Sequence, residues 1–223
     1  MSGFTLKARA AAPLRLDLRG ITPAALAALS AAEVERLEIG HGNALVPLAE
    51  FFAVEARSDD TMVLAGDLSR CDRIGWQMDG GTLLIDGSAG DYVGAGLRSG
   101  EISVKGDAGA LAACEMAGGT LRIAGSVGDF AASTLPGSMD GMRGGTLIVG
   151  GNAGARFGDR MRRGTALIFG NAGDFLASRM VAGTIALAGR AGAHAGYGMR
   201  RGSVVFAGPA PGASPTFVPA VAG

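Results

Sequence analysis

A segment of 13 residues recurs along most of this chain, and its recurrence restricts the possible folds more than any other feature. Residues 78–90 read MDGGTLLIDGSAG, similar segments begin at residues 97, 116, 142, 161 and 180, and a shortened copy spans 199–208. Successive copies start 19 residues apart, except for one step of 26 whose excess falls around 133–141. A fixed period of this size indicates a repeat architecture, in which each unit buries its apolar face against its neighbours.

Each copy contains a short run in which outward and inward residues alternate, as they do along a strand. These runs are only about four residues long, too short for helices, and the glycines around them mark turns. Because a period of 19 is not a multiple of six, a left-handed hexapeptide helix is disfavoured. The sequence therefore predicts an all-β fold, a right-handed parallel β-helix with coils of about 19 residues, stacked about 4.8 Å apart. The expected inward pairs are Leu83/Ile85, Ile102/Val104, Leu121/Ile123, Leu147/Val149, Ala166/Ile168, Ile185/Leu187 and Val204/Phe206.

Two further repeat positions are interpreted as structural. Methionines at 78, 116, 142, 161, 180 and 199 share one position and are predicted to form a core stack. The residue after the second turn glycine alternates between aspartate (91, 129, 174) and alanine (110, 155, 193). Carboxylates in every coil would stand about 5 Å apart and repel each other, and skipping a coil doubles the distance. We interpret these aspartates as hydrogen-bonding corner residues and not as a row of catalytic acids.

The first 60 residues do not repeat, and we expect them to form a small α+β cap over one end of the solenoid, which would otherwise be an open edge. The local signals are two alternating runs and two helix starts, at Phe4–Ala8, Leu14–Leu18, Thr22-Pro23 and Ser30 with Glu33. The chain is thus predicted to divide into a cap (1–60), a parallel β-helix (61–208) and an extended or disordered tail (209–223), in which Phe217 favours docking.

Composition excludes several classes of protein. The chain has 20 basic and 20 acidic side chains, and a net charge of zero argues against nucleic acid, which is bound largely by neutralising phosphates. It has no signal peptide and no apolar run long enough to span a bilayer. Cys71 and Cys114 are few and far apart, as expected in a reducing compartment. We therefore predict a cytoplasmic protein that binds neither nucleic acid nor membrane.

The sequence offers no recognisable catalytic or metal site. His41 and His194 are the only histidines, and no C-x-x-C or H-x-H occurs, whereas a zinc site needs three or four such ligands. The acidic residues are scattered or at corners, so the paired carboxylates of glycoside hydrolysis are missing. No serine lies in a G-x-S-x-G turn. We therefore predict no catalytic residue and no metal ligand in this chain.

An apolar stripe is expected on the outside of the later coils, where the residue between the two inward positions becomes apolar. It comprises Ile148, Leu167 and Val205, with Ala186 between the last two. An exposed apolar stripe running over several coils suggests a docked partner. We predict a partner interface here, although the appendage or the tail could cover it instead.

Arginines also gather at the corner where the strands of the later coils begin. The set is Arg143, Arg160, Arg162, Arg163, Arg179, Arg200 and Arg201, continued by Arg98. One interpretation is a solvated face with local partners such as Asp140 and Asp159. The others are a docking site for an acidic protein surface and a binding site for a polyanionic ligand.

The G-G-T-L-x-I-x-G-x-A-G units, preceded by G-N-x-x-x-P-L-x-x-F-F-x-V-E at 42–55, resemble the C subunit of formylmethanofuran dehydrogenase. They are similar in particular to its homologue in the bacterial formyltransferase/hydrolase complex of methylotrophs. The resemblance covers about residues 37–208. The GXGXG-type repeat alone is also similar to the C-terminal domain of the glutamate synthase large subunit, where it follows a much longer catalytic chain that is absent from this sequence.

The resemblance implies a scaffold subunit of an enzyme complex in tetrahydromethanopterin-linked one-carbon metabolism. That complex passes a formyl group from tetrahydromethanopterin to a methanofuran-type furan-amine carrier and hydrolyses it to formate during formaldehyde oxidation. The implied partners are an amidohydrolase-like, a molybdopterin-oxidoreductase-like and a formyltransferase subunit, and metals are expected only in those partners. The carrier in such systems has a glutamate-rich tail, so the arginines are predicted to form a polyanion-binding ridge, comprising Arg143, Arg162, Arg163, Arg200 and Arg201.

Two other functions remain open from the sequence. The chain could be a glutamate synthase-like accessory domain, which predicts a neighbouring glutaminase-type partner. It could also be a stand-alone β-helix enzyme that acts on a polymer, which predicts activity from the purified chain and an open groove with paired acids.

Overall fold

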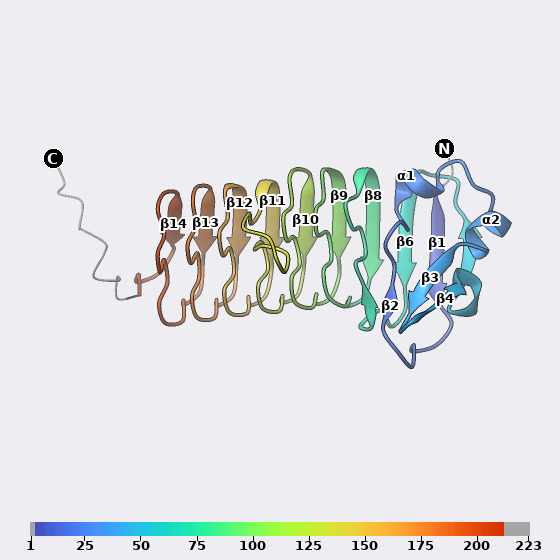
Figure 1. Cartoon of the computed structure of the whole chain (residues 1–223), viewed down its shortest axis with the longest axis horizontal. Coiled ribbons are helices and arrows are strands. Elements are labelled where there is room, and N and C mark those ends of the chain that lie inside the picture. The colour runs from blue at the N-terminus through green and yellow to red at the C-terminus, as the bar shows by residue number, and fades with distance from the viewer. Residues whose placement is uncertain (1–2, 212–223) are drawn as a thin grey trace.

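Successive coils of the chain stack into one long, mostly parallel sheet in the computed structural model, which describes residues 3–211. Ten strands form this sheet in the order β14-β13-β12-β11-β10-β9-β8-β6-β1-β5, and Figure 1 shows the coils side by side along the long axis of the molecule. The predicted all-β parallel β-helix is confirmed. Its repeat strands are β6 (Thr61–Ala65), β8 (Asp79–Asp86), β9 (Ser99–Val104), β10 (Thr120–Ile123), β11 (Arg143–Val149), β12 (Arg163–Ile168), β13 (Thr184–Leu187) and β14 (Ser203–Phe206).

Strand register follows the sequence repeat. Leu121 of β10 pairs with Ile102 of β9 on one side and with Leu147 of β11 on the other. The inward positions from Leu83 to Leu187 are all buried, and so are the methionines of the predicted stack at 78, 116, 142, 161 and 180. Because equivalent side chains lie directly above each other, each coil buries the apolar surface of the next, and the core runs the length of the stack.

The side of each coil away from this sheet does not form a second sheet of regular strands. A single residue per coil bridges to its neighbours there, as Ala89 does to Ala108 and Ala172 to Ala191. The chain then enters the left-handed region at non-glycine residues such as Phe130 (φ 59°) and Phe175 (φ 61°). A residue at positive φ interrupts the extended backbone of a strand, so each coil from β8 onward contains one strand and a series of turns.

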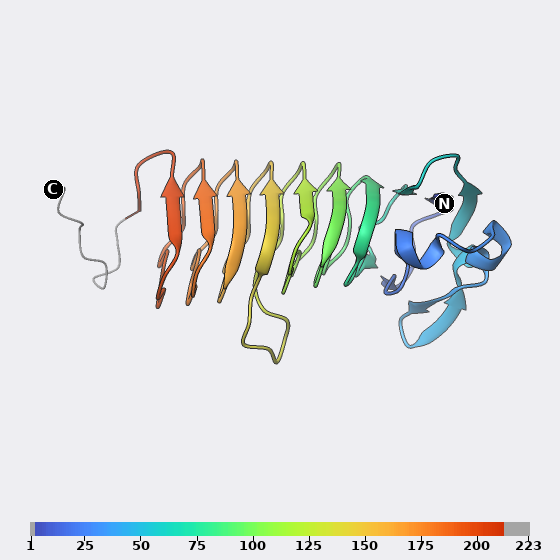
Figure 2. The same cartoon turned by 90° about the horizontal axis from the view of Figure 1, so that it is seen from above.

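The seven extra residues of the long step form a loop between β10 and β11. The pairing of Thr120 with Thr146 shows that the two strands keep their register across it. Figure 2 shows the loop leaving the stack beside β11. The insertion therefore adds a projection on one side of the solenoid without disturbing its core.

The N-terminal region joins the solenoid by hydrogen bonds and does not merely lie over its end. Strand β1 pairs in parallel with β6 and antiparallel with β5, and β2 pairs in parallel with β7. The predicted helix starts are present, since Thr22 accepts a hydrogen bond from the Ala25 amide and Ser30 forms a capping box with Glu33. The elements are β1 (Phe4–Ala8), β2 (Leu16–Asp17), α1 (Pro23–Leu26), α2 (Ala31–Glu35), β3 (Glu38–His41), β4 (Ala44–Pro47), η1 (Leu48–Glu50), β5 (Phe52–Ala56) and β7 (Cys71–Asp72).

The predicted division of the chain is compatible with these elements, since residue 60 lies between β5 and β6. Most of the predicted tail, residues 212–223, lies outside the described residues. Both helices are short, and within residues 3–211 no helix is long and apolar enough to cross a membrane.

Candidate functional site

The alternating aspartates hold successive coils together. The Oδ1 atom of Asp91 accepts a hydrogen bond from the amide of Ala110 (2.9 Å), and Asp129 and Asp174 bind the amides of the next coils, at Ala155 (2.7 Å) and Ala193 (2.8 Å). Each aspartate accepts a hydrogen bond from the backbone N–H of the alanine at the same position in the following coil, and so gives that N–H group a partner. These carboxylates therefore have a structural role.

A second series of polar side chains does the same at the preceding turn, and we call it the polar ladder. Its members accept hydrogen bonds of 2.7–3.0 Å from the amide 19 or 26 residues further on, and they are Ser88, Asp107, Ser126, Asn152 and Asn171. Arg15, which the sequence does not single out, completes the first coils by binding Asp72 (2.7 Å) and Asp91 (2.7 Å) together. Asp72 and Asp91 lie 19 residues apart, at the same repeat position of successive coils, so aspartate does not alternate with alanine there. The Arg15 cation offsets the negative charge of both carboxylates.

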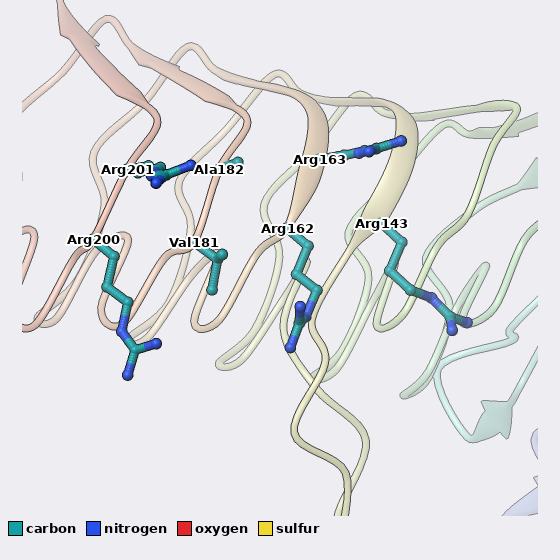
Figure 3. Close-up of a pocket in the computed structure, with 7 residues that line it drawn as sticks. All are labelled: Arg143, Arg162, Arg163, Val181, Ala182, Arg200 and Arg201. Carbon is teal, nitrogen blue, oxygen red and sulfur yellow. The ribbon is translucent and has the colours of Figure 1, made fainter.

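Five arginines line a groove of about 650 Å³ at the strand-start corner of β11 to β14, and we call it the arginine groove. Its lining residues are Arg143, Arg162, Arg163, Val181, Ala182, Arg200 and Arg201. These five arginines are the ones predicted as the polyanion ridge, and all five are exposed. Figure 3 shows their side chains in two rows, with Val181 and Ala182 between the neighbouring arginines.

The repeat explains this geometry. Positions 162, 181 and 200 are 19 residues apart, as are 163, 182 and 201, so each set forms a row across three coils. The middle coil carries Val181 and Ala182 where its neighbours carry arginine pairs. Because coils are stacked at the strand spacing, the two pairs stand about 10 Å apart. The groove therefore has an apolar floor between two cationic rims.

The arginines of this corner differ in their partners. Arg162 forms an ion pair with Asp140 of the projecting loop, and Arg143 lies 4.0 Å from Glu115. Within residues 3–211, Arg163, Arg200 and Arg201 have no acidic group within ion-pair distance. Three cations are therefore available to a ligand.

Two arginines predicted for the same corner do not line the groove. Arg179 binds both carboxylate oxygens of Asp159 (2.8 and 3.0 Å), and Arg160 lies 3.8 Å from the same group. Asp159 is 3% exposed and also accepts a hydrogen bond from Ser178. These two arginines neutralise a buried acid, which fits the local-partner interpretation.

The surplus of positive charge is confined to one end of a neutral chain. Residues 175–223 contain four arginines and no acidic residue. A one-sided distribution of this kind creates a positive potential that attracts anions. The arginine groove lies within this segment and the coils next to it.

The apolar stripe lies on the outer face of the sheet, and its members are direct cross-strand neighbours. Ile148 pairs with Leu167, Leu167 with Ala186, and Ala186 with Val205. Val205 is 53% exposed, and Phe169, close to the stripe, is 61% exposed. A shallow hollow of about 170 Å³ lies between Leu167, Phe169 and Val205. Toward β10 the stripe ends at Arg122, which faces Ile148.

The cysteines are buried and free. Burial raises the pKa of each thiol, Cys71 and Cys114, to about 12, so neither is a thiolate nucleophile near neutral pH. Within residues 3–211, no group of three or more His, Cys, Asp and Glu side chains is placed to hold a metal ion.

The whole fold has a counterpart among solved structures. A chain of the formyltransferase/hydrolase complex (FhcABCD) from Methylorubrum extorquens, solved in complex with methylofuran, superposes with a TM-score of 0.91 and 41% identity, covering 96% of this chain and 80% of that one. The C subunit of the Fhc complex from the same species is 42% identical over 86 residues, 39% of this chain and 32% of the relative. This chain belongs to the family of formyltransferase/hydrolase C subunits.

Formylmethanofuran dehydrogenases contain further relatives of this family. The C subunit of molybdenum-containing formylmethanofuran dehydrogenase 1 from Methanosarcina barkeri is 35% identical over 95 residues, covering 40% of this chain and 32% of the relative. Its counterpart in tungsten-containing formylmethanofuran dehydrogenase 2 from Methanothermobacter marburgensis is 34% identical over 97 residues, with 41% and 36% covered. The matched segments span about a third of these curated relatives. No protein-family model matches the chain. The resemblance predicted from the repeats is confirmed.

Proposed function

We propose that this chain is a structural subunit, without an active site of its own, of a formyltransferase/hydrolase complex in tetrahydromethanopterin-linked one-carbon metabolism. The complex transfers a formyl group from formyl-tetrahydromethanopterin to a furan-amine carrier and hydrolyses the product to formate. The observation that carries this proposal is the match of 96% of the chain, at 41% identity, to a chain of the FhcABCD complex. The use of the aspartates in holding coils together supports a scaffold role.

The proposed partners are the other subunits of such a complex: an amidohydrolase-like subunit, a molybdopterin-oxidoreductase-like subunit and a formyltransferase. The apolar stripe of Ile148, Leu167 and Val205 is the proposed contact with one of them. Its side chains, of which Val205 is exposed and the others are half-buried, form a continuous row along four strands, and a contiguous apolar row on a protein surface is typical of a protein interface.

The arginine groove is the proposed contact for the polyanionic part of a methanofuran-type carrier. Its two arginine pairs stand about 10 Å apart, and an extended chain advances about 3.3 Å per residue. Carboxylates three residues apart in an extended acidic chain therefore reach both rims. Arginine also binds carboxylates in a planar, two-bonded geometry, and the free Arg163, Arg200 and Arg201 offer that contact.

Purification of the chain from its native source under gentle conditions tests the scaffold role. We expect three larger subunits to elute with it in fixed stoichiometry, with formyl transfer and hydrolysis in the same fractions. Elution as an isolated monomer or trimer, with the activity in other fractions, would contradict the proposal.

The groove is tested on the purified full chain with a synthetic decaglutamate peptide as the probe. Each exposed ion pair contributes about 0.5–1 kcal/mol, so Arg200→Ala with Arg201→Ala should weaken binding about fivefold to thirtyfold. The matched control is Lys105→Ala with Arg122→Ala, which removes two exposed cations away from the groove. Equal weakening in both variants would mean that the peptide senses only total charge.

A further inference from the structure

The solenoid is closed at its N-terminal end but open at its other end in the described residues. Met180, Ile185 and Leu187 of the coil of β13 are at most 1% exposed. In the last coil the corresponding Met199, Val204 and Phe206 are only partly buried. The same residue positions lose their cover because no further coil among residues 3–211 lies on them. An apolar core surface is therefore left exposed at β14.

The backbone shows the same asymmetry. Strand β14 is the last strand of the sheet and pairs only with β13 among residues 3–211. An open strand edge invites pairing with other chains, and proteins normally cover or interrupt such edges. At the opposite end the repeat strands continue into β1 and β5 of the cap.

A groove of about 590 Å³ follows this open end. Its walls are the side chains of the last coil, including Met199, Val204 and Phe206, and the chain itself leaves through it at Ala210 and Pro211. The residues that come next in the sequence are GASPTFVPAVAG at 212–223, and they follow directly on Pro211, a lining residue of the groove. Six further residues, to Phe217, reach up to about 20 Å, which is enough to cross the end of a coil.

The chemistry of this segment matches the surface. It contains no charged side chain, and its larger side chains are Phe217, Val218 and Val221. Pro215 and Pro219 lack the N–H that a strand ladder needs, so the segment can cover the edge of β14 without offering a new edge for other chains.

A second copy of the chain fits the same surface less well. A face-to-face arrangement that brings the two strand-start corners together would place Arg200 and Arg201 of each copy near those of the other. No acidic residue after Asp174 is present to offset them, and like charges brought together in a partly desolvated contact repel strongly.

We propose that residues 212–223 fold back over the open end of the solenoid, with Phe217 in the groove against Met199, Val204 and Phe206. The segment acts as a C-terminal counterpart of the N-terminal cap. This inference is independent of the function proposed above, because it concerns the end of the core and not the outer surfaces.

Amide hydrogen exchange on the full chain tests the proposal, with Phe217→Ser and a chain shortened to residue 211 as variants. We expect exchange of the β14 amides to become at least tenfold faster in both, and binding of a fluorescent apolar dye to rise. Ala213→Ser adds a hydroxyl to the same segment before Phe217 and serves as the control, with exchange as in the parent chain.

Equal β14 exchange in the full and shortened chains would overturn the proposal. So would protection of β14 that depends on protein concentration, with a dimer seen by light scattering, because a second copy would then be the cover. A third contrary outcome is protection that appears only in the assembled complex, which would assign the end surface to a partner subunit.

Discussion

Two sets of polar side chains lie on either side of the methionine stack, at the same corner of the coils, and they are used in opposite ways. On one side, Cys114, Ser133, Asp159 and Ser178 share one repeat position, separated by steps of 19, 26 and 19 residues, and all are buried; we call them the buried row. Just after the methionines lie the exposed cations of the arginine groove. Members of the buried row bind each other across coils, as Ser178 binds Asp159 and Cys114 contacts Ser133 (3.5 Å).

The difference separates structure from function within one repeat. A buried polar group must find its partner inside the fold because an unsatisfied one is costly. Exposed arginines have no such requirement, and three of those in the groove have no acidic partner among residues 3–211. Cations kept together without internal partners are not needed by the fold, so a ligand outside the chain is the better explanation for them.

The largest expected effect concerns the thiol in the buried row. Burial raises the pKa of Cys114 from 9.0 to about 12, so at pH 8 its thiolate fraction is about a thousandfold lower than in the unfolded chain. Iodoacetamide labelling of native protein should be slower by at least that factor than labelling in urea. Rapid labelling of Cys114 in the native chain would show that the buried row opens to solvent.

The same shift predicts how stability depends on pH. The thiol pKa is higher in the folded chain than in the unfolded chain, so the folded chain holds this proton more tightly. The free energy of unfolding should therefore decrease as the pH rises from about 9 to about 12. Cys114→Ser should reduce this loss in urea titrations, whereas an unchanged slope would contradict the burial of the thiol.

Removal of the acid from the buried row should have the next largest effect. Asp159→Ala leaves the hydroxyl of Ser178 without its acceptor and separates Arg179 from its partner. We expect the free energy of unfolding to fall by about 3 kcal/mol, measured by urea denaturation. Asp140→Ala is the matched control, since it removes an exposed acid paired with Arg162 and should cost less than about 1 kcal/mol. Similar losses in the two variants would remove the distinction between the sites.

A single step of the polar ladder should be worth less than the buried acid. Asn152→Ala removes the acceptor for the Asn171 amide (2.8 Å) and should lower the free energy of unfolding by about 1 kcal/mol. Asn152→Asp retains an acceptor oxygen and should recover most of that stability. If thermal unfolding of the alanine and aspartate variants is the same, the ladder does not hold the coils together.

Sequence reasoning predicts the parts of this molecule that repeat and misses the parts that depend on distant residues. The inward positions of every strand follow from local alternation, and the capping box at Ser30 and Glu33 from local spacing. Strand β1 joins the sheet because Leu6 pairs with Leu64 and Val54. No local pattern indicates such a pairing, so the sequence suggests a separate cap instead.

The same limit applies to the candidate site. Seven arginines share one corner of the sequence repeat, but only the structure separates those that bind Asp159 from those that line the groove. The burial of Asp159 decides this, and burial depends on how the coils stack. The left-handed residues also lack a sequence signal, because Phe130 and Phe175 occupy positions where glycine would be expected.

The smallest effect on stability is expected in the arginine groove. Arg200→Ala with Arg201→Ala removes two exposed cations that have no acidic partner among residues 3–211 and lie near Arg162 and Arg163. The loss of like-charge repulsion should leave the free energy of unfolding unchanged or raise it by a few tenths of a kcal/mol at low salt. Because salt screens exposed charges, any gain should disappear in about 1 M NaCl.

The paired cations outside the groove give the contrasting result. Lys105→Ala with Arg122→Ala breaks two exposed ion pairs, with Asp86 and Glu101, and should lower the free energy of unfolding by about 0.5 kcal/mol at low salt. The two double variants therefore differ in sign although they remove the same charge. A loss of more than about 1 kcal/mol in the groove variant would make its arginines part of the fold, and the case for an external anion would fail with it.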